Sequence, residues 1–172
     1  MHREIAEAAW RWVLDQVRYD EGGPWIPVTP LDTEPSWDRD GMHSGVGGLV
    51  HALAEVARSR PWTAEESSLA AAIAVRLRAV TPTATDTTFF DGLVSHLDCL
   101  VLLGEPGVDA CVDRLLELAP DGWPESNDAT LGTAAILLGA VTAAERTCRV
   151  LASWRRTPPT GCWPRPRRPR PA

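Results

Sequence analysis

The sequence predicts an all-α fold, and two observations carry that prediction. First, the apolar residues make up 44% of the chain and are mainly Ala, Leu and Val, with only two Phe, two Met and one Tyr. This composition favours helices over strands. Second, apolar residues recur at helical spacing in a series of segments along the chain. With 172 residues, the chain has the size of one ordinary domain with one core.

The first helix is expected over about residues 2–18. Its apolar stripe should face the core and consists of Ile5, Ala8, Ala9, Trp12 and Val13. The following segment, residues 24–40, contains four prolines, which cannot donate backbone hydrogen bonds to a sheet. We therefore expect residues 24–40 to form a long loop across one end of the fold.

The rest of the chain alternates between strongly apolar helices and helices of mixed polarity. Apolar helices are expected over about residues 44–59, 92–103 and 128–145, and mixed ones over 63–80 and 106–118. The first mixed helix begins at a capping box, in which the side chains of Thr63 and Glu66 each accept a backbone amide. Its Leu69, Ile73 and Leu77 should face inward.

Three apolar helices begin with similar glycine motifs, which indicates an internal repeat. The aligned glycines are Gly45, Gly92 and Gly132, and their separations of 47 and 40 residues are typical of helical hairpins. Three positions later each motif has a small residue: Gly48, Ser95 or Ala135. We attribute this preference to crowding between inner helices.

Such a repeat can stay open as a solenoid or close into an α/α toroid, a ring of alternating inner and outer helices. The ring is favoured, because the proposed inner helices are more uniformly apolar than the outer ones. The expected fold is therefore a partial α/α toroid of about three helical hairpins.

Charge and composition exclude several classes of function. Residues 1–154 hold 11 Arg and 23 acidic residues, and an acidic body argues against nucleic-acid binding. The N-terminus lacks the apolar region of a secretory signal, and no apolar run is long enough to span a membrane. We expect a cytoplasmic protein with neither nucleic-acid nor membrane partners.

Three sequence motifs resemble those of lanthionine synthetase C-like proteins. They are Gly-Met-His-Ser-Gly-Val-Gly-Gly-Leu at 41–49, Phe-Phe-Asp-Gly-Leu-Val-Ser at 89–95 and Asp-Ala-Thr-Leu-Gly-Thr-Ala at 128–134. The resemblance covers about residues 1–145 and implies a toroid of seven inner and seven outer helices, of which this chain holds about three pairs. It also implies peptide modification, in which a peptide Cys thiol adds to a dehydrated Ser or Thr.

The resemblance further implies a zinc ion that activates the thiol in full-length relatives. Its ligands come from Trp-Cys-x-Gly and Cys-His-Gly motifs, and neither motif is present here. No metal residue is assigned, because a zinc site needs at least three well-placed protein ligands. We expect no cofactor in this chain and treat Cys99, Cys111 and Cys148 as buried helix residues.

The polar candidates for a binding site lie at the glycine ends of the apolar helices or just inside them. They are Asp40, His43, Asp91, His96 and Asp128. These side chains could line a central cavity that meets a peptide or a sugar. A structural role is the preferred alternative: Asp91 and Asp128 can cap helices, His43 is a loop residue, and His51 and His96 are core histidines.

The last 18 residues, 155–172, contain six prolines and six arginines and are not expected to pack as a helix. Three readings compete for this tail: a basic interaction arm, a polyproline linker, or the out-of-frame end of a GC-rich coding sequence. The last is favoured. The predicted division is a partial toroid over residues 1–154 and a disordered tail over 155–172.

The leading functional hypothesis is a truncated lanthionine synthetase C-like protein without independent catalysis. One alternative is a carbohydrate-active enzyme of the six-hairpin toroid type, with Asp91 and Asp128 as acid and base. Another is a non-enzymatic helical interaction module. An incomplete ring exposes the apolar flanks of its terminal hairpins, which predicts self-association.

Overall fold

The computed structural model describes residues 2–118, 126–128 and 132–154, and the side chains of these residues except 142, 143 and 146–154. Its elements in chain order are α1 (His2–Asp15), β1 (Arg18–Asp20), β2 (Gly23–Trp25), α2 (Val46–Ser59), α3 (Ala64–Val80), the 3-10 turn η1 (Thr81–Thr83), α4 (Leu93–Leu103), α5 (Val108–Leu118) and α6 (Thr133–Trp154). The all-α prediction is confirmed, apart from one small sheet. No helix among the described residues has the length and apolar character needed to cross a membrane.

Three helix boundaries differ clearly from expectation. The first helix ends at Asp15 instead of near Arg18, and α6 spans Thr133–Trp154 instead of about 128–145. The start of α3 is as predicted: Thr63 accepts the Glu66 amide, and Glu66 accepts the Thr63 amide. Gly104 ends α4 in the left-handed conformation, with φ of 69°, which favours glycine.

The expectation of a strand-free loop from Pro24 onward is wrong at its first residues. Strands β1 and β2 pair antiparallel, with Arg18 opposite Trp25 and Asp20 opposite Gly23. Gly23 makes the tight turn possible, because its φ of 104° lies in the left-handed region. Arg39 then fixes the hairpin by donating to the Asp20 carboxylate and to the carbonyl oxygen of Gly23.

The apolar face of α1 is also oriented differently from the prediction. Ile5 and Trp12 are 63% and 57% exposed, and the side of α1 that packs against the core carries Trp10, Val13 and Leu14. Val17, just after the helix, also packs there. A polar contact explains this orientation. The Trp10 indole donates to the buried carboxylate of Glu66 at 2.6 Å, which turns that side of the helix inward.

Glu66 is the anchor of this contact and is only 1% exposed. Arg60 donates to both carboxylate oxygens of Glu66 at 2.8 Å and also to the Glu7 carboxylate. The hydrogen bond from Arg60 is the main cause that lowers the pKa of Glu66 to about 2. The buried carboxylate is therefore ionised and paired at neutral pH.

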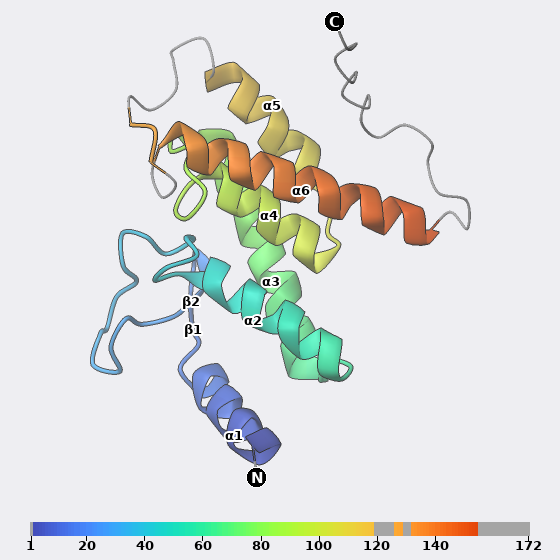
Figure 1. The fold of residues 1–172 in the computed structure, drawn as a ribbon. Coiled ribbons are helices and arrows are strands. Elements are labelled where there is room, and N and C mark those ends of the chain that lie inside the picture. Colours follow the sequence, from blue (N-terminus) through green and yellow to red (C-terminus); the bar gives the residue numbers. More distant parts are fainter. Residues whose placement is uncertain (1, 119–125, 129–131, 155–172) are drawn as a thin grey trace, which may run out of the picture.

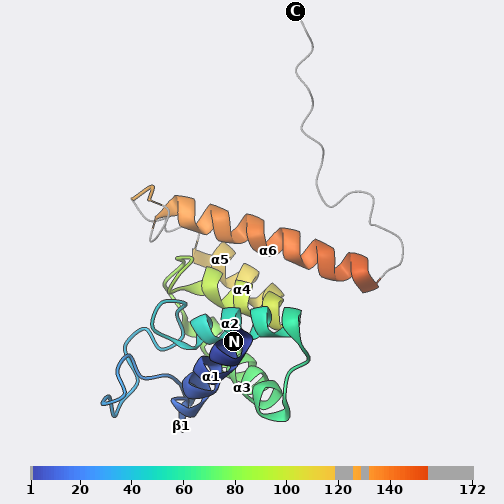
Figure 2. The same ribbon diagram turned by 60° about the horizontal axis from the view of Figure 1, so that its bottom comes forward.

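The helices form two layers, with α2, α4 and α6 side by side and running in the same direction (Figure 1). Helices α3 and α5 run in the opposite direction behind them (Figures 1 and 2). Helix α4 lies between α2 and α6 and also packs against α3 and α5. The two layers therefore run antiparallel to each other; closure into a toroid stays a prediction.

Burial follows from these positions. All nine residues Leu93–Val101 of α4 are buried, because the helix has neighbours on most of its circumference. Helix α6 instead buries one face, through Ala135, Ile136 and Gly139. The other face exposes apolar side chains: Leu137 by 65%, Leu138 by 53% and Val141 by 37%.

We predict that Gly139→Ala destabilises the fold by about 1–3 kcal/mol. A Cβ at Gly139 would overlap Val94 Cγ1 and lie 2.6 Å from the Phe89 ring, where α6 meets α4. Urea denaturation followed by circular dichroism measures the change. Ala140→Ser on the exposed face of α6 is the control and should stay within about 0.5 kcal/mol. Equal stability of the two variants would contradict the close packing of α6 against α4 at Gly139.

Candidate functional site

The loops that precede α2, α4 and α6 share one backbone hydrogen bond. The carbonyl oxygen of Arg39 accepts the Val46 amide at 2.9 Å, that of Asp86 accepts Leu93 at 2.8 Å, and that of Ser126 accepts Thr133 at 2.9 Å. In each case the donor follows the acceptor by seven residues. The three glycine motifs therefore share the same closing hydrogen bond, in the register of the sequence alignment.

The glycines are required by space in this loop. A Cβ at Gly45 or Gly132 would overlap the carbonyl oxygen of Arg39 or Ser126, and one at Gly92 would lie 2.5 Å from that of Asp86. Those oxygens are the acceptors of the shared hydrogen bond. The φ values of Gly45 and Gly92, −123° and −108°, suit any residue, so the constraint is steric.

The small residues three positions later have a related explanation at Gly48. A Cβ there would lie 2.6 Å from the carbonyl oxygen of Met42, in the loop before the same helix. The close neighbour is thus the helix's own loop, and not another inner helix as the sequence analysis inferred.

The first two loops form a continuous surface. The Met42 amide donates to the Phe90 carbonyl at 2.6 Å, which joins the loop before α2 to the loop before α4. The His43 ring stacks on the Phe90 ring with 5.2 Å between centroids. Polar side chains from both loops are consequently held beside one another.

A cavity of about 310 Å³ lies at this junction, at the N-terminal end of α4. Its polar lining includes the carboxyl groups of Asp38, Asp40, Asp86 and Asp91 together with the His96 ring. Asp38 and His96 are buried, with 5% and 4% exposure. The cavity is the only place where the structure gathers several of the sequence-predicted polar residues within the described part of the chain.

Asp91 and Asp38 line the same cavity and interact with one another. Asp38 accepts the Ser44 hydroxyl at 2.9 Å. Burial raises the pKa of Asp91 above its ordinary value, and the charges of Asp38 and Asp86 add to this effect. The charge of His43 lowers the pKa of Asp91. On balance the pKa of Asp91 is raised, so this carboxyl group keeps its proton to a higher pH than an exposed aspartate does.

The other two polar groups have different environments. Arg76 donates to both carboxylate oxygens of Asp40, with 2.7 Å between its Nη2 and Oδ2, so the charge of Asp40 is balanced. His96 Nδ1 lies 3.5 Å from the Thr81 hydroxyl. Burial lowers the pKa of His96, which favours the neutral imidazole at neutral pH.

The remaining predicted residues lie elsewhere. His43 is a loop residue, as expected, and lines a second cavity of about 270 Å³ together with Met42 and Gly48. Asp128 lies in the third loop, where its Oδ2 accepts the Ser126 hydroxyl at 2.5 Å. The expected caps at Asp91 and Asp128 are wrong, because α4 is capped by Gly92 without a side-chain bond and α6 begins at Thr133.

Asp38 and Asp86 were missed as site residues. Both precede the repeat glycines, by seven residues before Gly45 and by six before Gly92. Extending the motif alignment upstream would have placed two acids at the start of two equivalent loops. The interaction between Asp38 and Asp91 depends on how the two loops pack against each other, so it could not be predicted from the alignment alone.

The carbohydrate-active alternative rests on Asp91 and Asp128 as acid and base. Glycosidases separate their two carboxyl groups by about 5–9.5 Å to leave room for the sugar or a water. Asp91 lines the cavity before α4, and Asp128 lies in the loop before α6. Their use as a catalytic pair stays a prediction.

Cysteines and histidines outside the cavity are parts of the packed layers. Cys99 and Cys111 are buried, as predicted, and burial raises the pKa of the Cys111 thiol. Cys148 and Cys162 lie outside the described side chains. His51 Nε2 lies 3.4 Å from Asp98 Oδ2, which joins α2 to α4. The described residues include no group of three His, Cys, Asp or Glu placed to hold a metal.

No protein-family profile matches the sequence, and no curated protein or solved structure matches it either. The chemistry of the site therefore has to be inferred from its own residues.

We predict that Gly92→Ala lowers the free energy of unfolding by more than about 3 kcal/mol. The added Cβ would meet the backbone oxygen of Asp86, which cannot move without the rest of the loop. Gly22→Ala is the matched control. Its Cβ would meet side-chain ends and no backbone atom, with Arg39 and Arg76 at 3.0 Å and Asp20 at 3.2 Å, so the free energy of unfolding should change by less than about 1 kcal/mol. Thermal and urea unfolding compare the two variants. A mild effect at Gly92 would mean that the loop closure is not rigid.

We predict that Asp91→Asn becomes more stable relative to the wild type as the pH rises from about 4 to about 7. A folded pKa above 3.8 means that Asp91 stabilises the fold at low pH, and that this contribution is lost as the pH rises through the raised pKa. The variant stays neutral throughout. Urea unfolding at several pH values measures the difference. Asp113→Asn, at an exposed position of α5, is the control, and its difference should not follow the same trend.

Proposed function

We propose that this chain is part of a lanthionine synthetase C-like α/α toroid and that it binds a peptide without modifying it. The observation that carries the proposal is the loop closure repeated before α2, α4 and α6, in register with the three family-like motifs. Equivalent loops on parallel inner helices are what a ring of repeated hairpins requires. We further propose that a complete relative closes the ring of which this chain forms a part.

The charge of the cavity indicates which peptide side chains it would accept. Asp40 is balanced by Arg76, which leaves the carboxyl groups of Asp38, Asp86 and Asp91 as the acidic lining. A Lys or Arg side chain of a peptide is complementary to such a lining. The proposed ligand is therefore a peptide with a basic residue close to its Cys and dehydrated Ser or Thr.

Catalysis by this chain alone is not part of the proposal. The cyclases of the family use two Cys and one His as zinc ligands, and both motifs that supply them are missing from the sequence. The described cysteines, Cys99 and Cys111, are buried between helices. The chain would thus provide one wall of a peptide-binding site. The addition of the thiol would need residues that another polypeptide supplies.

We predict that a labelled peptide with Lys, Cys and dehydroalanine binds the purified chain, as measured by fluorescence anisotropy. Added salt should weaken binding, because the attraction is electrostatic. Asp91→Asn should weaken it by about three- to tenfold, and a Lys→Glu peptide is the matched control. Equal affinity for the Lys and Glu peptides would contradict the proposed ligand.

The same samples test the absence of catalysis. Mass spectrometry after thiol alkylation should find no thioether ring, and elemental analysis after dialysis should find zinc well below one ion per chain. Ring formation, or one tightly held zinc per chain, would show that this chain carries cyclase chemistry of its own.

A further inference from the structure

The row of inner helices has an open side at each end within the described part of the chain. At one end, α6 presents a stripe of Ala134, Leu137 and Val141 that continues to Glu145 at helical spacing. Leu137 is 65% exposed and Val141 37%. The stripe carries no charged residue before Glu145. We call these four residues the α6 stripe.

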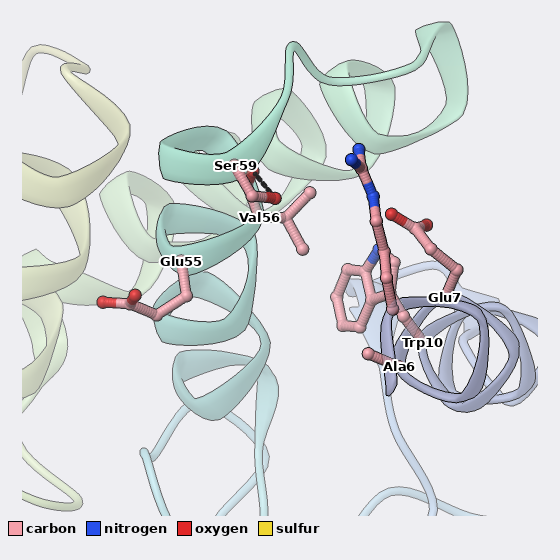
Figure 3. A pocket seen from close by; sticks show the side chains of 7 residues that line it. Ala6, Glu7, Trp10, Glu55, Val56 and Ser59 are labelled. Atoms are coloured by element: carbon pink, nitrogen blue, oxygen red, sulfur yellow. Dashed lines mark hydrogen bonds between the residues drawn. The ribbon is translucent and has the colours of Figure 1, made fainter. Parts of the chain in front are cut away.

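At the other end, a groove of about 390 Å³ separates α1 from α2. Figure 3 shows Ala6 and Trp10 on one side of it and Val56 on the other, with Glu7, Glu55 and Ser59 around them. Arg3 also lines the groove. We call it the α1–α2 groove: it has apolar walls and charged residues along its rim.

We propose that the α6 stripe of one copy packs along α2 of a second copy, with Glu145 at the α1–α2 groove, and that the second copy does the same in return. The result is a dimer with two-fold symmetry, in which two rows of three inner helices close one ring. This inference rests on the toroid arrangement proposed above, but not on peptide binding.

Helix direction permits this closure. The inner helices α2, α4 and α6 all run the same way (Figure 1). A two-fold axis parallel to them leaves that direction unchanged, so α6 of one copy meets α2 of the other as a parallel neighbour. Within the chain, α4 has this relation to both α2 and α6. The proposed contact therefore repeats a packing that the fold already contains.

The positions of the residues along the helices and their charges also fit the proposed contact. Glu145 follows Gly132 by 13 residues, as Arg58 follows Gly45, so the repeat register places Glu145 level with the end of α2. The groove lies at that level, between Glu55 and Ser59. The two acids on its rim, Glu7 and Glu55, are paired with Arg60 and Arg58. Arg3 on the same rim carries the charge opposite to that of the exposed Glu145. The apolar part of the α6 stripe would then lie along α2.

The available area indicates two contacts and not one. The exposed apolar groups of the α6 stripe amount to roughly 200 Å², a fraction of the about 800 Å² per partner in a standard interface. A single contact of this kind is too small for a stable pair. Two-fold symmetry doubles it, and burial of the groove walls and of the helix backbones adds to the sum.

We predict that the wild-type chain sediments as a dimer in analytical ultracentrifugation. Leu137→Asp should produce monomers, because it places a charge in the apolar contact. Leu116→Asp on α5 is the matched control, since Leu116 is 64% exposed and lies on neither surface; it should leave the dimer intact. Circular dichroism checks that both variants keep their helices.

Charge reversal tests the pairing itself. Arg3→Glu and Glu145→Arg should each weaken the dimer about tenfold or more, and the double variant should restore it to within about threefold. A monomeric wild type, a dimer that survives Leu137→Asp, or a double variant weaker than either single one would overturn the proposal. Open chains of growing length would overturn the closed pair. These outcomes are independent of peptide binding, which is measured separately.

Discussion

The structure depends on one constraint: a loop carbonyl oxygen occupies the space that a Cβ would need at the start of each inner helix. At Gly45, Gly92 and Gly132 that oxygen accepts the amide of the next residue, the first of the helix. Loop and helix are therefore locked at a fixed angle, three times in succession. Because the angle repeats, α2, α4 and α6 become parallel neighbours. The loops before α2 and α4 consequently bring their polar residues together at one end. The acidic cavity is a product of that repetition.

Much of the fold could be predicted because its signals are local. The capping box at Thr63, the apolar run of α4 and the three glycines each act within one helix and its loop. What failed involves contacts between distant segments. The orientation of α1 depends on Trp10 reaching Glu66, 56 residues away, and the β1–β2 hairpin is held by Arg39 from outside. Neither interaction leaves a periodic pattern in the sequence.

The candidate site shows the same division. Asp40, Asp91 and His96 could be chosen because they stand next to the glycine motifs, and the cavity brings them together. Asp38 and Asp86 could not be ranked above other acids without knowing that two loops touch. The raised pKa of Asp91 depends on burial as well as on the nearby charges, and burial is a property of the assembled loops. The location of the site can therefore be predicted from the local glycine motifs, whereas its chemical character depends on the tertiary packing of the loops.

Glu66 couples two helices that are far apart in the chain. Its carboxylate accepts the Thr63 amide at the first turn of α3 and, in the same conformation, the indole of Trp10. The acceptor that positions α1 is therefore held in place by the cap of another helix. As a consequence, the position of the first helix depends on a helix that begins nearly fifty residues downstream. A change at the cap of α3 would be felt at the N-terminus as well.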